Sequence, residues 1–109
     1  MSHQSTNRDW MEALHSEHRL LAILRALVRL PEYTGNAALM RDRLNAIGLV
    51  ASWETVRADL CRIKEMGLAE VYESPASAWR VTLTERGIDV AEGRSVTEGI
   101  RRPEPGCQY

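Results

Sequence analysis

A long helical segment with two apolar stripes is the feature that most restricts how this chain can fold. Good helix formers run from Asp9, which can cap a helix, to Leu30, and Pro31 ends the segment. Its apolar residues form two stripes at helical spacing: Leu20, Ile23, Leu27 and Leu30 in one, and Leu14, Leu21, Leu24 and Val28 in the other. A helix on the surface of a domain needs only one apolar stripe. We therefore expect the second stripe to be covered as well, either by the C-terminal helix or by another chain, and we take it as a candidate homodimer interface.

The length and composition indicate one small globular domain in the cytoplasm. The chain has 109 residues, of which 44% are hydrophobic and 27% charged, and its two cysteines are too few for a disulfide framework. The N-terminus lacks the apolar core of a signal peptide, and no apolar stretch is long enough to span a membrane. We expect a disordered segment at 1–8, the domain at 9–93 and an irregular tail at 94–109.

Two further short helices are predicted by their caps. Glu32 to Asn36 is expected to be a turn, and Thr34 or Asn36 can cap a helix over Ala37–Ile47, with Gly48 after its end. Inward positions of this helix are Ala38, Leu39 or Met40, Leu44 and Ile47. Ser52 can accept a hydrogen bond from the Thr55 amide and start a helix to Met66, which Gly67 ends.

A β-hairpin and a last helix follow. Leu68–Glu73 and Ala78–Leu83 are β-prone and flank a turn at Ser74–Ser77. In the second run Trp79, Val81 and Leu83 alternate with polar or small residues, so that one face is buried. Thr84 can cap a helix that ends near Gly93. The order of elements predicts an α+β, mostly helical winged helix-turn-helix domain with a three-helix core, a two-stranded wing and a C-terminal helix.

The hairpin and the C-terminal region also carry a resemblance. Lys64-Glu65-Met66-Gly67-Leu68 and Val81-Thr82-Leu83-Thr84-Glu85-Arg86-Gly87 resemble the hairpin of ArsR- and MarR-type bacterial regulators. Leu83-Thr84-Glu85-Arg86-Gly87-Ile88-Asp89-Val90-Ala91-Glu92-Gly93-Arg94, with Gly99-Ile100-Arg101-Arg102-Pro103, resembles small ArsR-like winged-helix proteins of Mu-like prophages. The resemblance covers residues 10 to 105 and implies a phage-encoded cytoplasmic protein with a regulatory role.

The helix from Ser52 to Met66 is the candidate DNA-recognition helix. Trp53, Val56, Leu60 and Ile63 fall on one side, which should be core. The opposite side presents Glu54, Thr55, Ala58, Cys61, Arg62 and Glu65. If this helix enters the major groove, Ser52, Thr55, Ala58 and Arg62 approach the bases, and Arg57 and Lys64 meet phosphates. The two glutamates on the outer side oppose this interpretation, because they repel DNA.

Further cations are candidates for phosphate contacts. Arg41 and Arg43 lie on the preceding helix and Arg80 on the hairpin. Residues 41–64 carry five basic and three acidic side chains, a net charge of +2, whereas residues 65–109 carry five basic and eight acidic side chains, a net charge of −3. The basic excess therefore coincides with the predicted helix-turn-helix.

Catalysis and metal binding have little support in the sequence. No nucleophile motif, phosphate-binding glycine loop or metalloprotease signature is present. His15 and His18 can share a helix face, but the paired cysteines of metal-sensing relatives are missing. We expect no enzyme activity, cofactor, metal or small-molecule substrate.

Two functions remain open at this point. The first is a dimeric DNA-binding transcriptional regulator of phage genes, with double-stranded DNA as its partner. The second is a non-catalytic protein-interaction module in phage assembly or DNA packaging, which the acidic outer face of the candidate recognition helix and the second apolar stripe favour.

Overall fold

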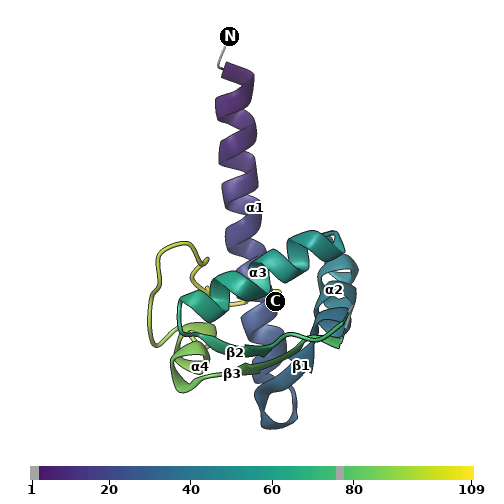
Figure 1. Ribbon diagram of the computed structural model, residues 1–109. Coiled ribbons are helices and arrows are strands. Elements are labelled where there is room, and N and C mark those ends of the chain that lie inside the picture. The colour runs from purple at the N-terminus through teal and green to yellow at the C-terminus, as the bar shows by residue number, and fades with distance from the viewer. Residues whose placement is uncertain (1–2, 76–77) are drawn as a thin grey trace.

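The structure, a computed structural model, describes residues 3–75 and 78–109, and the side chains from residue 9 on within those ranges. The helices are α1 (His3–Val28), α2 (Ala37–Ala46), α3 (Trp53–Glu65) and α4 (Glu85–Ala91), with a 3₁₀ turn at Pro31–Tyr33 (Figure 1). The strands are β1 (Thr34–Asn36), β2 (Ala69–Tyr72) and β3 (Arg80–Leu83). The described chain is thus α+β and mostly helical, as the sequence predicted.

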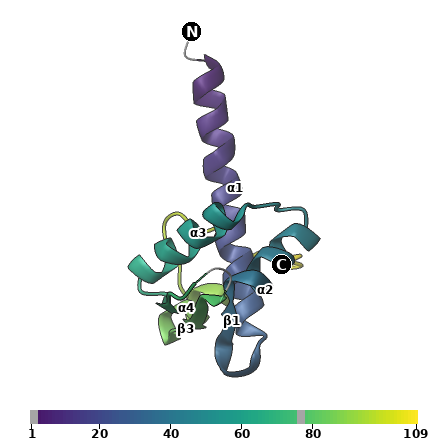
Figure 2. The same cartoon turned by 45° about the vertical axis from the view of Figure 1, so that its right-hand side comes forward.

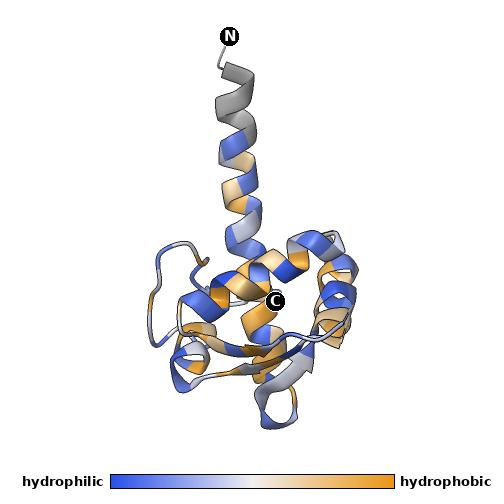
Figure 3. Cartoon of the chain, in the orientation of Figure 1, coloured by the Kyte–Doolittle hydropathy of each residue, from blue (hydrophilic) through white to orange (hydrophobic). Residues whose placement is uncertain are grey.

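Helix α1 crosses the body of the molecule and then projects beyond it (Figures 1 and 2). It begins at His3 and not at Asp9. The segment that was expected to be disordered is therefore helical from His3 on, and residues 1–2 lie outside the described residues. Orange residues lie on the projecting part of α1 as well as inside the body in Figure 3.

Local capping sets the limits of α2 and α3 as predicted. The Asn36 side chain accepts a hydrogen bond from the Leu39 amide at 2.8 Å, and Ser52 Oγ accepts one from the Thr55 amide at 3.2 Å. Gly48 and Gly67 have φ of 84° and 77°, the left-handed conformation typical of a residue that follows a helix. Of the two alternatives for the core side of α2, Met40 is buried and Leu39 is 43% exposed.

The predicted hairpin forms the larger part of a three-stranded antiparallel sheet. Its strands are β2 and β3, and residues 76–77 of the connecting turn lie outside the described residues. Val81 and Leu83 are buried and Arg80 is exposed, which confirms the predicted alternation. The sequence analysis missed β1, which pairs with β3 in the sheet order β1-β3-β2. A three-residue strand is too short to show an alternation of polar and apolar residues. Because Thr34–Asn36 consists of residue types common in turns, the sequence predicted a turn there.

The second apolar stripe of α1 is covered largely within the same chain. Leu21 and Leu24 are buried, and α4 packs against α1. Arg25 Nη1 donates to the carbonyl of Ala91 at the end of α4, at 3.0 Å. Of the two covers that the sequence left open for this stripe, the C-terminal helix and another chain, the structure shows the C-terminal helix. The prediction that Leu21 and Leu24 lie at a homodimer interface is therefore wrong, because neither side chain is accessible.

The C-terminal tail is irregular, as predicted, but it is docked on α1. Ile100 and Tyr109 are buried, and the Arg101 amide donates to the carbonyl of Glu17 at 3.2 Å. The Tyr109 hydroxyl lies 2.7 Å from His18 Nδ1. Arg29 and Arg43 both donate to the main-chain oxygen of Tyr109. These contacts, at both ends of residues 100–109, hold the tail against the helix.

The residues that carry the C-terminal resemblance have structural roles. Thr84 Oγ1 accepts from the Gly87 amide at 3.1 Å and donates to the carbonyl of Gly67 at 2.8 Å. A Cβ atom at Gly87 would lie 2.0 Å from the Leu68 carbonyl oxygen, so only glycine lets α4 approach the chain there. Thr84 and Gly87 therefore fix the position of α4.

Candidate nucleic-acid interface

Helix α3 has the buried and exposed sides that its periodicity predicted. Val56, Leu60 and Ile63 are buried, and Trp53 is half-buried. The exposed residues of the helix are Glu54, Ala58, Arg62, Lys64 and Glu65. The outer side of α3 is therefore accessible to a partner.

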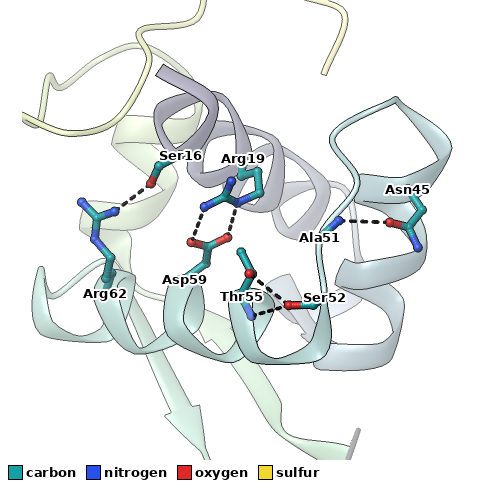
Figure 4. Close-up of polar contacts among 8 residues, drawn as sticks. All are labelled: Ser16, Arg19, Asn45, Ala51, Ser52, Thr55, Asp59 and Arg62. Carbon is teal, nitrogen blue, oxygen red and sulfur yellow. Dashed lines mark hydrogen bonds and ion pairs between the residues drawn. The ribbon is translucent and has the colours of Figure 1, made fainter. Parts of the chain in front are cut away.

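A buried ion pair between α1 and α3 was missed by the sequence analysis. Asp59 has a side chain only 3% exposed, and both of its oxygens accept from Arg19, at 2.7 and 3.3 Å (Figure 4). The pattern 56, 59, 60, 63 follows helical spacing, so the position of Asp59 at the edge of the core face could have been read from the sequence. A carboxylate at such a position requires a cation, because an unpaired buried charge is costly. The pair neutralises the one carboxylate of α3 that is not on its surface.

A polar groove separates the projecting part of α1 from the start of α3. Its volume is about 610 Å³, and its lining includes Ser52, Thr55 and Arg62, three of the predicted DNA contacts. Arg62 Nη1 donates to Ser16 Oγ at 2.7 Å, and the Ser52 hydroxyl donates to Thr55 Oγ1 at 3.1 Å (Figure 4). Asp9 and Glu12 of α1 also line the groove. Ser52 and Thr55 thus bond to each other, whereas Arg62 keeps most of its donors accessible.

Arg57 and Lys64 lie together on one flank of α3, two helical turns apart. No hydrogen bond or ion pair joins the side chain of either one to another described residue. Arg57 is half-buried and Lys64 is exposed. With Arg62, they give the surface of α3 three cations against two carboxylates, those of Glu54 and Glu65, because Asp59 is neutralised inside.

The two arginines of α2 do not share a surface. Residues two positions apart on a helix point about 200° away from each other. Arg41 lies 4.8 Å from the Trp53 ring centre and donates to the carbonyl of Ala51, whereas Arg43 donates to Tyr109. Both are half-buried and brace the fold. Each guanidinium thus donates one hydrogen bond of 3.4 Å within the chain, and their role as phosphate contacts stays a prediction.

The hairpin supplies one exposed cation. Arg80 on β3 lies 5.2 Å from the ring centre of Tyr72 on β2, so the two side chains stack across the sheet. Ala58, the remaining predicted contact, is exposed on the outer side of α3. The nine predicted DNA contacts divide by exposure. Five are exposed, namely Ser52, Ala58, Arg62, Lys64 and Arg80, and four are half-buried, namely Arg41, Arg43, Thr55 and Arg57.

His15 and His18 do not form a metal site with other ligands. Within the described residues, no group of three or more histidine, cysteine or acidic side chains is placed to hold a metal ion. His18 instead contacts Tyr109, and burial, followed by the charge of Arg101, lowers the pKa of its ring below the usual value of 6.5. Among the helices of the described ranges, none has the combination of length and apolar composition that a membrane span needs.

Comparison with known proteins places the chain among phage proteins. Over 90 residues it is 39% identical to the uncharacterized protein gp26 of Escherichia phage Mu, and the match covers 83% of this chain and 92% of that protein. The chain belongs to the gp26 family. The phage part of the predicted resemblance is thereby confirmed, and the ArsR-like, winged-helix part stays a prediction. No protein-family model matches this gp26 relative, and no solved structure matches it.

Proposed function

We propose that this gp26 relative is a winged helix-turn-helix protein that binds double-stranded DNA and regulates transcription of phage genes. The order α1, α2, α3 and hairpin, with a C-terminal helix behind them, supports this proposal. In such a domain the second helix of the helix-turn-helix enters the major groove and the hairpin lies near the adjacent backbone. Here that helix is α3.

The observation that carries the proposal is the charge on the surface of α3. The outer side itself is acidic, because Glu54 and Glu65 face only Arg62. Arg57 and Lys64 flank this side, and the remaining carboxylate of the helix, Asp59, is buried against Arg19. The exposed charges of α3 then favour a polyanion, because phosphate neutralisation supplies most of the affinity of such proteins for DNA.

The exposed residues of α3 divide into two roles. Arg62 and Ala58 lie where bases would be contacted, and an arginine can donate two hydrogen bonds to guanine. Ser16 holds one nitrogen of Arg62 at 2.7 Å and so restricts its rotamers before DNA arrives. Lys64 and Arg57 lie on the flank, where they would meet the phosphates on one side of the groove.

The test is fluorescence anisotropy with random-sequence double-stranded DNA, at about 50 mM and about 200 mM salt. We expect binding at low salt and a loss of affinity by orders of magnitude at high salt. Lys64→Ala should weaken binding to all sequences and lower the slope of log affinity against log salt by about 1. Arg62→Ala should in addition relax the preference for a selected operator. Arg94→Ala is the matched control, because it removes an exposed arginine that pairs with Asp89 and Glu92 near α4.

A second candidate function is a protein-interaction module in phage assembly or packaging. The two carboxylates on the outer side of α3, Glu54 and Glu65, favour it, since they would repel DNA at the centre of the interface. The same titration separates the two functions. Absence of binding at about 50 mM salt would reject the DNA proposal and favour a protein partner, because phosphate contacts are strongest there.

A further inference from the structure

The guanidinium group of Arg62 is held at one nitrogen and open along one edge. Its Nη1 donates to Ser16 Oγ on α1 at 2.7 Å (Figure 4). No other hydrogen bond or ion pair joins this side chain to a described residue, and Arg62 is exposed on α3. The edge formed by Nε and Nη2, which carries two parallel N–H donors, is therefore available to a partner.

The tail passes beside this open edge at Gly99. A Cβ atom at Gly99 would lie 3.5 Å from Arg62 Nη2 and 3.6 Å from Met66 Cε. The φ of Gly99 is 91°, in the left-handed region that favours glycine. The tail is fixed at this point, because Ile100 is buried and the amide of Arg101 donates to a main-chain carbonyl of α1. A longer side chain at position 99 would fill the space beside Nη2, whereas glycine leaves that space open.

The surroundings of Arg62 favour a neutral acceptor over a phosphate. Asp9 and Glu12 line the same groove, and the exposed Glu98 precedes Gly99 in the tail. These carboxylates repel a phosphate that approaches the groove. In the major groove, guanine presents N7 and O6 side by side as two neutral acceptors, whereas adenine presents a donor beside N7. The two parallel donors of Arg62 therefore match guanine.

We propose that Ser16 and Gly99 are positioning residues, which aim the open edge of Arg62 at a guanine in the major groove. This inference rests on the proposed function, because it needs α3 to enter the groove. The ion pair between Arg19 and Asp59 holds α1 against α3, so the Ser16 hydroxyl has a defined place before DNA binds. A guanidinium that is already oriented loses less side-chain entropy on binding, and so the contact discriminates more strongly between bases.

The first experiment measures sequence preference separately from affinity for DNA in general. Selection from a pool of random-sequence duplexes supplies a preferred duplex, and fluorescence anisotropy compares it with the unselected pool. Ser16→Ala should lower the ratio of the two affinities by roughly 5-fold, as expected for the loss of one hydrogen bond. Affinity for the unselected pool and its salt slope should stay unchanged. Ser16→Thr should restore the ratio, because threonine keeps the hydroxyl, whereas a merely structural role of Ser16 would lower both affinities alike.

A base analogue identifies the guanine that is read. Each guanine of the preferred duplex is replaced in turn by 7-deazaguanine, which lacks the N7 acceptor. At the position that Arg62 reads, the replacement should weaken wild-type binding by roughly 10-fold. The same replacement should leave the binding of Arg62→Ala unchanged, because that variant has no donor to lose.

A pair of glycine variants tests the role of the tail. Gly99→Leu should lower the ratio of the two affinities, because the side chain occupies the space beside Arg62 Nη2. Gly106→Leu is the matched control, since Gly106 also lies on the tail with a φ of 77° but has nothing within 4 Å of its Cβ position. Circular dichroism checks that both variants keep their helices.

The outcomes separate this inference from the proposed function. Absence of binding to the unselected pool at about 50 mM salt would overturn the proposed function and the inference with it. Binding to the pool would uphold the DNA proposal, and three results would then overturn the inference alone. These are a selection without a preferred sequence, an unchanged ratio in Ser16→Ala, and equal ratios in Gly99→Leu and Gly106→Leu.

Discussion

The second apolar stripe of α1 runs into both halves of the helix, which have opposite surroundings. In residues 20–28 the stripe of Leu20, Ile23 and Leu27 and the stripe of Leu21 and Leu24 are all buried. In residues 9–16 the continuation of the second stripe is open, with Trp10 and Met11 exposed. The apolar repeat therefore shows which sides of a helix are suited to burial, but the neighbouring elements decide which of them are buried.

A polar collar of Ser16, His18 and Arg19 marks the boundary between the halves. Ser16 and Arg19 contact Arg62 and Asp59 of α3, and His18 contacts Tyr109 of the tail. Side chains at the collar thus hold the buried half in position, whereas those beyond it can be changed without disturbing the core. The predictions that follow test this division.

The largest effect is expected from Arg19→Ala, which removes the main ion pair of the collar. Asp59 would stay buried without its cation, and the loss of one partner from a buried pair costs about 3–5 kcal/mol of unfolding free energy. Urea denaturation followed by circular dichroism measures it. The double variant Arg19→Met with Asp59→Leu should recover most of the loss, because it leaves no buried charge. A cost below about 1 kcal/mol for the single variant would mean that water reaches the pair.

Truncating one leucine to alanine in each half of α1 tests whether the two halves differ in packing. Leu24→Ala should cost about 2–5 kcal/mol, because it leaves a cavity in the core. Leu14→Ala should cost less than about 1 kcal/mol, since Leu14 is only half-buried and alanine is the better helix former. Midpoints of urea denaturation compare the two variants. Equal losses would contradict the division and indicate that the projecting half is packed in the monomer.

The features that the sequence predicted correctly are those set by neighbouring residues. Asn36, Ser52 and Thr84 each cap the helix that follows, and the amide that each accepts from lies three residues further along the chain. The hairpin strands were predicted from alternation within β3. Such features need only short-range geometry, so one sequence contains enough information for them.

The features that the sequence analysis missed depend on residues far apart in the chain. Thr34–Asn36 became a strand because β3 offers it partners, and Arg43 turns inward because Tyr109 lies beside it. Asp59 is separated by 40 residues from the arginine that neutralises it. For this reason the sequence predicted which side of α3 is exposed but not the ion pair at the edge of its buried side.

The smallest effect is a pH dependence at the collar, through His18. Burial and then the charges of Arg101 and His15 lower the pKa of His18 from 6.5 in the folded chain, against an opposing contribution from Glu17. The folded state then binds fewer protons than the unfolded state just below pH 6.5, so stability rises with pH there. The stabilisation is complete above pH 6.5 and is lost as the pH falls toward the folded-state pKa. Denaturation midpoints at about pH 7.5 and 5.5, which span the usual histidine pKa, should therefore move apart less in His18→Gln than in the wild type. An equal shift in both would show that protonation of this ring does not loosen the tail from α1.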